Sequence, residues 1–391
     1  MLSKAKDILK KNTMLIALGV VMVLFQMLIV AAGKGSLFAP ANISNLISQN
    51  SYVVILATGM LLCILTGGNI DLSVGSVVAL VGAIAGTLIV NMKVNIYLTM
   101  LICLLAGLAI GCWQGFWIAY VRIPPFIVTL AGMLLWRGLA LLVLDGLTIS
   151  PFPEVYLKYF TSFLPNVEDK AVVLTVTLII GSAASGVYIL SQILGRISKR
   201  RKGYAVENLF WQIARVVVIC AVVMVVSYLL GKHKGIPVVL ILMAVIVLAY
   251  SYFTSRTVPG RHLYALGGNE KAAKLSGVDT NFTLFFAYAN MAFLSAVAAL
   301  VAVARFNSAA PSAGTNYEMD AIGACFIGGA SAYGGIGTVG GAVIGAIFMG
   351  VLNNGMSILG VDANWQKVVK GLVLLAAVVF DVLSKKRVKA S

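Results

Sequence analysis

Residues Ser255–Asn281, SRTVPGRHLYALGGNEKAAKLSGVDTN, form a polar stretch between two long apolar runs. The runs Ile236–Phe253 and Phe282–Val303 are each long enough to cross a lipid bilayer as a helix. We therefore expect a membrane-embedded chain from which this loop projects into water.

A short helix is predicted inside the loop. Asn269 is a good N-cap, and Glu270 places a negative charge in the first turn, where the helix dipole favours it. Gly277 supplies a left-handed stop, while Gly267 and Gly268 are expected to form a flexible lead-in. The pattern predicts a two-turn helix over Glu270–Ser276.

This helix carries a basic side and a small apolar side. Lys271 and Lys274 face one way at a spacing of three residues, whereas Ala272, Ala273 and Leu275 leave an apolar surface. A helix of this length is marginal in water by itself, so a cover for that surface is expected. The loop is interpreted as a docking element for a soluble partner, with a simple solvated connector as the alternative.

Composition places the whole chain in the membrane. Of 391 residues, 60% are hydrophobic and 11% are charged, and the mean hydropathy is +0.99. Soluble domains carry about 25% charged residues. No polar stretch is long enough for a soluble domain, so residues 1–391 are expected to form a single transmembrane domain. The five cysteines lie in apolar runs without metal-ligand spacing, so neither a metal site nor disulfides are predicted.

The basic residues that give the net charge of +16 are unevenly distributed along the chain. Basic residues concentrate at alternate boundaries between apolar runs, which is the positive-inside pattern and places both termini and the Ser255–Asn281 loop in the cytoplasm. The intervening boundaries, including those with Glu318 and Asp320, are expected outside. A nucleic-acid partner is not predicted, because no contiguous basic patch with interleaved aromatics is visible. The basic sets are Lys4, Lys6, Lys10 and Lys11, then Arg122, Arg196–Lys202, Arg256–Lys274 and Lys385–Lys389.

The fold class that follows is an all-α polytopic membrane bundle with about 10 to 12 transmembrane segments, some interrupted or re-entrant. The segment Ala321–Gly329 is too short to cross alone. The expected segments are Thr13–Ala32, Leu46–Thr66, Leu72–Val90, Ile96–Ala119, Phe126–Leu144, Ala171–Leu194, Val216–Leu230, Ile236–Phe253, Phe282–Val303, Ala321–Gly329, Val339–Leu359 and Val368–Leu383.

Two interruptions carry ionisable residues. In GGNIDLSVGS, Gly67–Ser76, two glycines end one helix, and Asp71 or Ser73 can cap the next. Asp71 is expected to face protein or water, because an acid at the bilayer centre costs about 2.5–3.5 kcal/mol. After the tandem prolines of IPPFIVTL, Arg137 lies about three turns along a helix and needs a carboxylate or carbonyl partner.

A third interruption is IGGASAYGGIGTVGGAVIGAIFMG, Ile327–Gly350, whose glycines indicate unwound backbone. Interrupted helices commonly flank a transport pathway, so the Asp71 and Gly334–Gly341 breaks are interpreted as a pair. The alternative is that these glycines only permit close helix packing. The pathway candidates are Asn69, Asp71, Ser73, Arg137, Tyr333, Gly334, Gly335, Asn353 and Asn354.

Two other functions fit the sequence less well. An ion-coupled secondary transporter needs paired intramembrane carboxylates or a proton-relay histidine, and Asp71 is the one clear internal acid of the sequence. A membrane enzyme is disfavoured, because the sequence has no HExxH or GxSxG motif.

Four blocks together resemble the permease subunit of bacterial monosaccharide importers of the ATP-binding cassette type, which take up ribose, galactose or xylose. They are GGNIDLSVGS, the IPPFIVTLAGM and WRG pair, YALGGNEKAAKLSGV, and the tail Tyr317–Gly371. Ala171–Phe253 carries two spans more than the ribose type, which is similar to the xylose or multiple-monosaccharide branch.

The resemblance implies a transport subunit of the bacterial inner membrane, without catalysis of its own, that moves a pentose or hexose inward by alternating access. It implies a homodimer that receives sugar from an extracytoplasmic binding protein. It also implies a cytoplasmic ATPase subunit, which uses ATP and Mg²⁺, while this chain binds no cofactor. The family's coupling helix corresponds to Glu270–Ser276 within the loop 255–281.

Overall fold

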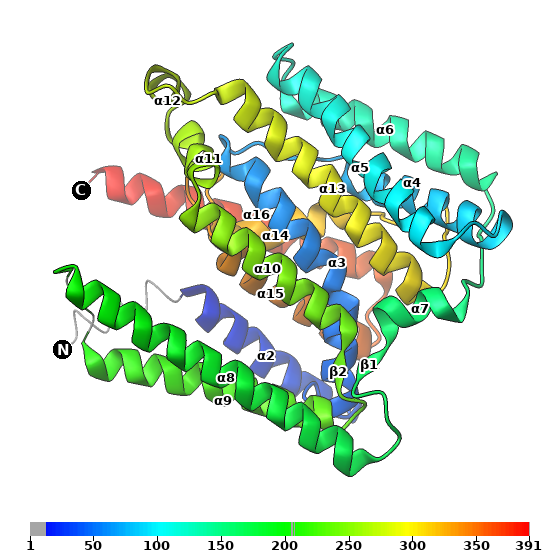
Figure 1. Cartoon of the computed structure of the whole chain (residues 1–391), viewed down its shortest axis with the longest axis vertical. Coiled ribbons are helices and arrows are strands. Elements are labelled where there is room, and N and C mark those ends of the chain that lie inside the picture. The colour runs from blue at the N-terminus through cyan, green and yellow to red at the C-terminus, as the bar shows by residue number, and fades with distance from the viewer. Residues whose placement is uncertain (1–12, 205, 207, 391) are drawn as a thin grey trace.

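A computed structural model describes residues 13–204, 206 and 208–390, and it shows a bundle of helices that run roughly along one direction (Figure 1). Lys4, Lys6, Lys10 and Lys11, as well as the side chains of Lys385–Lys389, lie outside the described part. Within the described ranges, ten helices are long and apolar enough to cross a membrane, which agrees with the expected all-α polytopic bundle.

The first half of the chain supplies five of these ten helices and a short helix at one end of the bundle. The expected segment Ile96–Ala119 is found with those same ends, and the other four differ from the expected ends by a few residues. The elements are α2 (Thr13–Ala31), α3 (Pro40–Leu65), α4 (Val74–Gly86) with its π-helical end η1 (Thr87–Asn91), α5 (Ile96–Ala119), α6 (Pro125–Leu144) and α7 (Glu154–Thr161).

The second half supplies the other five, together with shorter helices and two very short strands that pair with each other. The elements are β1 (Phe163–Leu164), α8 (Lys170–Arg201), α9 (Leu209–Gly231), β2 (Ile236–Pro237), α10 (Val238–Arg256), α11 (Val258–Gly268), α12 (Glu270–Leu275), α13 (Thr280–Phe306), α14 (Tyr317–Ile327), α15 (Val339–Ile358) and α16 (Ala363–Ala390).

Four helices form the interior. In their most apolar windows, α3, α4, α13 and α15 have 78%, 72%, 72% and 67% of their residues buried, against 11% for α9. Outer helices expose large apolar side chains such as Leu134, Leu142 and Val187. Exposed apolar surface on this scale suits lipid and not water.

Glycines let α5 pack tightly on α13. Gly107, Gly111 and Gly115 recur at every fourth position of α5, so they share one face. A Cβ on Gly111 would lie 2.7 Å from the Cα of Ala289 on α13. Small residues at this spacing allow backbones to approach closely, as in other membrane helix pairs.

Two interior elements are interrupted, as predicted. The chain leaves helical geometry between α3 and α4 and again between α14 and α15. The helix α14 has 11 residues, which confirms that the segment near Ala321–Gly329 does not cross alone.

The two ends of the bundle differ. α11 and α12 lie at one end, whereas α7, β1 and β2 lie at the other (Figure 1). α7 caps its end by packing on α13, where the Tyr156 hydroxyl donates to the carbonyl oxygen of Leu300 at 2.8 Å.

The additional helices form a peripheral hairpin. α8 and α9 lie side by side at the margin of the bundle (Figure 1), and α9 touches α3. With α10, the stretch Ala171–Phe253 therefore contains the three expected helices.

Candidate functional site

The predicted loop helix is present as α12. The Asn269 side chain accepts a hydrogen bond from the amide of Ala272 at 3.0 Å, and Gly277 has φ +84°. The helix ends at Leu275, one residue before the expected end, and Ser276 is the C-cap. Local capping alone therefore explains where this helix starts and stops.

The apolar residues of α12 differ in how far they are buried. Ala273 is buried against its own chain, whereas Leu275 is 90% exposed. Lys271 and Lys274 are also exposed, as the sequence predicted. A leucine held this far out on a capped helix is a natural anchor for a partner protein.

Arg122 ties α12 to the corner between α5 and α6. Its Nη1 lies 2.7 Å from Oε1 of Glu270, and Nη2 donates to the side chains of Thr280 and Asn281. Both charged side chains are about half exposed, so the pair contributes little to stability and acts mainly to orient α12. Nothing in the sequence indicates this pairing, since 148 positions separate the two residues.

Gly267 does not belong to a flexible lead-in, and that expectation was wrong. Gly267 and Gly268 form the last turn of α11, because the preceding segment is helical from Val258 onward. A Cβ on Gly267 would lie 1.8 Å from the Leu65 carbonyl oxygen and 2.5 Å from the Gly335 amide nitrogen. Glycine is required here by close packing and not by flexibility.

The two helix breaks contact each other beside Gly267. The amide of Gly335 donates to the carbonyl oxygen of Leu65 at 3.0 Å. A Cβ on Gly68 would lie 2.0 Å from the Ala332 carbonyl oxygen, and one on Gly334 would lie 2.4 Å from the Cα of Gly67. We call this meeting point of residues 65–68, 267–268 and 332–335 the glycine junction.

α11 makes a further contact with the second break. The Tyr264 hydroxyl donates to the carbonyl oxygen of Gly337 at 2.9 Å. Burial raises the pKa of Tyr264, which keeps the phenol neutral and able to donate. The loop that carries α12 is thus directly joined to both interrupted helices.

Asp71 lies in the protein interior, as expected. It is fully buried, and its Oδ1 accepts from the amide of Ser73 at 2.8 Å and from the Ser73 hydroxyl at 2.6 Å. Gln114 Nε2 donates to the same hydroxyl at 2.7 Å. Ser73 occupies the N-cap position of α4, but its side chain makes no capping bond, so the carboxylate of Asp71 organises this turn.

Arg137 has the carbonyl partners that its position required. Its Nη1 donates to the carbonyl oxygens of Pro311 at 3.1 Å and Ala313 at 2.6 Å. These bonds hold the segment between α13 and α14 against α6.

Replacing Arg137 with alanine should lower the thermal unfolding midpoint of the purified protein by several degrees. The reason is that two partly buried carbonyls lose their donor, at about 1–3 kcal/mol. Arg137→Lys, which can still reach one carbonyl, should give an intermediate midpoint. Equal midpoints for all three proteins would contradict this role.

The remaining pathway candidates lie apart from one another. Asn69 donates to Thr66 beside the glycine junction, where Tyr333 is 64% exposed. Asn354 exchanges two hydrogen bonds of 3.0 Å with Asn42, whereas Asn353 lines a separate cavity. The structure therefore brings together Asn69, Tyr333, Gly334 and Gly335, but not the full candidate set.

Two acids expected at an outer boundary are buried in α14. Glu318 and Asp320 are 5% and 2% exposed. Lys370 of α16 lies 2.9 Å from Oδ1 of Asp320, and Tyr52 donates to Oδ2 at 2.7 Å. The sequence does not predict these partners, because they lie far away along the chain; acids in the first turn of a helix were the available signal.

The chain is similar in sequence to known transport proteins. The family model described as branched-chain amino acid transport system, permease component, matches residues 42–378. The xylose transport system permease protein XylH of Haemophilus influenzae is 38% identical over 374 residues, which cover 96% of each chain.

Other relatives are similar over most of their length. XylH of Escherichia coli is 36% identical over 90% of this chain and 88% of its own. The ribose import permease protein RbsC of Escherichia coli is 34% identical over 90% and 89%. No solved structure matches this chain. The match to the family model, together with these full-length relatives, shows that this chain belongs to the family of transport-system permease components.

Proposed function

We propose that this chain is the transmembrane permease subunit of an ATP-binding cassette importer that moves a monosaccharide, a pentose such as xylose, into the cytoplasm. The observation that carries the proposal is the direct contact between the loop of α12 and both helix breaks at the glycine junction. The xylose and ribose permeases named above supply the substrate class.

In this proposal α12 is the docking element for a cytoplasmic ATPase subunit. The exposed Leu275 enters a pocket of the ATPase, and Arg122 fixes the helix orientation through Glu270. Movement of α12 is passed by α11 to the backbone at residues 65–68 and 332–335. Because those residues end or begin interior helices, the movement reaches the bundle core.

The energy source lies outside this chain. ATP and Mg²⁺ are used by the partner ATPase, and this chain contributes binding surfaces and no catalytic site. Two copies of the permease form the transport unit, with the pathway between them. Asn69, Asp71 and Tyr333 remain candidates for its lining.

The chain lies in the bacterial inner membrane with the α12 end in the cytoplasm. Arg196–Lys202 near the end of α8 and Arg256–Lys274 around α11 support this orientation, since basic residues concentrate on the cytoplasmic side. Both termini are assigned to that side as well. The opposite end, capped by α7, is where an extracytoplasmic sugar-binding protein delivers sugar.

The proposal is tested by reconstitution with the ATPase and the binding protein in vesicles. ATP-dependent uptake of radiolabelled xylose or ribose is expected, and uptake should not respond to ionophores. Uptake that requires an ion gradient and persists without the ATPase would overturn the proposal in favour of an ion-coupled transporter.

Substitution of Asp71 distinguishes an ATP-driven importer from an ion-coupled transporter. Asp71→Asn keeps an acceptor for the amide and hydroxyl of Ser73, so ATP-driven uptake should fall no more than about threefold. A proton-coupled carrier that uses Asp71 as its proton site should lose coupled transport entirely when this acid is neutralised. Uptake by matched vesicles of native and variant protein decides between these outcomes.

A further inference from the structure

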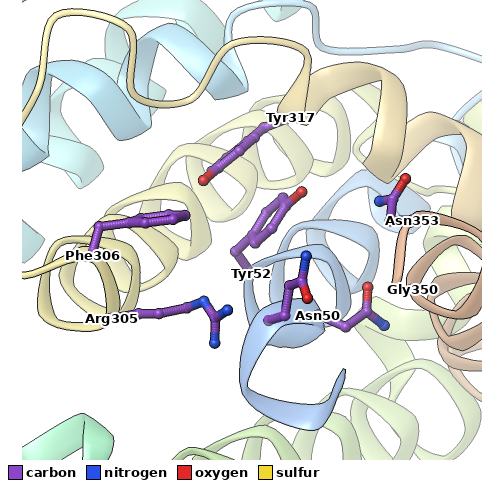
Figure 2. A pocket seen from close by; sticks show the side chains of 8 residues that line it. Asn50, Tyr52, Arg305, Phe306, Tyr317, Gly350 and Asn353 are labelled. Atoms are coloured by element: carbon purple, nitrogen blue, oxygen red, sulfur yellow. The ribbon is translucent and has the colours of Figure 1, made fainter. Parts of the chain in front are cut away.

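A cavity with several polar side chains in its lining lies between α3, α13, α14 and α15, near the end of the bundle opposite α12. Its volume is about 150 Å³, and its lining includes Asn50, Tyr52, Arg305, Phe306, Tyr317 and Asn353. Figure 2 shows these side chains arranged around one open space. It is distinct from the glycine junction and from the pair formed by Asn42 and Asn354.

The cavity presents unsatisfied hydrogen-bonding groups. Among the described residues, Oδ1 of Asn50, Oδ1 of Asn353 and Nε of Arg305 have no hydrogen-bond partner. Asn50 is 5% exposed, and its Nδ2 donates to the Ala346 carbonyl oxygen at 2.7 Å. That bond fixes the amide orientation and leaves Oδ1 as the free acceptor. A buried polar group left unpaired costs about 1–3 kcal/mol, so a ligand or water is expected here.

Neighbouring residues hold the cavity lining in position. A Cβ on Gly350 of α15 would lie 2.5 Å from Cγ of Asn50, so glycine is needed for the Asn50 amide to fit. Tyr52 is held by its bond to Asp320, and its ring stacks on that of Tyr317 with centroids 3.8 Å apart. The aromatic wall is therefore fixed in place before any ligand arrives.

The chemistry of the lining selects the ligand class. Two carbonyl oxygens disfavour an anion, and the guanidinium of Arg305 disfavours a metal cation. Hydroxyl groups both donate and accept, so they satisfy the asparagine oxygens and also Nε of Arg305. The volume equals that of about five water molecules, which is suited to one small neutral polyol.

We propose that this cavity binds one molecule of the transported monosaccharide within each permease chain, on the side where sugar arrives. The inference rests on the proposed function for the identity of the sugar. Hydroxyls of the sugar bond to Asn50, Asn353 and Arg305, and its apolar edge lies near the tyrosine wall. The permease then contributes to sugar selectivity in addition to the binding protein.

The test uses the full-length chain in lipid nanodiscs and D-xylose as the probe, with binding followed by saturation-transfer NMR. Binding to the native protein is expected, and Asn353→Leu should weaken it at least about tenfold, because one acceptor is lost. The control is Asn364→Leu, which removes an exposed amide outside the cavity and should leave binding unchanged. If Asn353→Leu does not fold, Arg305→Gln replaces it with the same expectation.

Absent binding by the native protein, or equal binding by Asn353→Leu, would overturn this inference and leave water as the occupant. Uptake by the reconstituted complex separates this result from the proposed function. ATP-driven xylose uptake without binding overturns only the inference that the cavity binds sugar. Binding without uptake supports that inference and counts against the proposed function.

Discussion

Replacing Gly267 with valine should reduce sugar-stimulated ATP hydrolysis by the reconstituted complex at least about tenfold, while the permease still inserts into the membrane. A Cβ at this position would lie 1.8 Å from the Leu65 carbonyl oxygen, so α11 must move away from both helix breaks. Forced overpacking of this kind costs about 1–3 kcal/mol. The expected loss is therefore one of coupling between α12 and the bundle core.

The matched control is the neighbouring glycine. A Cβ on Gly268 meets no atom within 4 Å, so Gly268→Ala should keep stimulation near the native level. ATPase assays on both variants, with and without loaded binding protein, make the comparison. Full stimulation in Gly267→Val would show that the glycine junction does not transmit the movement.

Replacing Leu275 with aspartate should weaken binding of the ATPase subunit about tenfold to a hundredfold. Leu275 is 90% exposed on a capped helix, and an anchor of this kind loses its desolvated contact when it becomes charged. The fold of the permease should be unaffected, because the Leu275 side chain has little contact with the rest of its own chain. Copurification and surface plasmon resonance with the ATPase measure the effect.

Leu275→Met is the conservative variant, and it should restore binding to near the native level because an apolar anchor is retained. Equal affinity of the ATPase for the aspartate and native proteins would place the docking surface elsewhere on the chain.

The spans of the fold could be predicted from sequence because the bilayer imposes a strict rule. A backbone in lipid must satisfy its own hydrogen bonds, so long apolar runs become helices, although α3, α8 and α9 extend well beyond the expected ends. The segment Ile96–Ala119 agrees at both ends. α12 was predictable for a different reason, since Asn269 and Gly277 define its ends by local geometry.

Contacts between remote segments could not be predicted in this way. Gly267 looked flexible because two adjacent glycines usually are, yet its role depends on where Leu65 and Gly335 lie. The partners of Asp320 could not be predicted either, since Lys370 and Tyr52 lie 50 and 268 positions away along the chain. The cavity at Asn353 is likewise formed by four helices, and no single stretch of sequence describes it.

In the proposed cycle, α12 lies on the inner side of the membrane and receives work from a separate ATPase. A cysteine at Leu275, in a protein whose five native cysteines have been replaced, tests this orientation. A membrane-impermeant maleimide should label this cysteine in inside-out vesicles and leave it unlabelled in intact cells, and bound ATPase should protect it. Labelling in intact cells would contradict the orientation, the partner and the proposed cycle together.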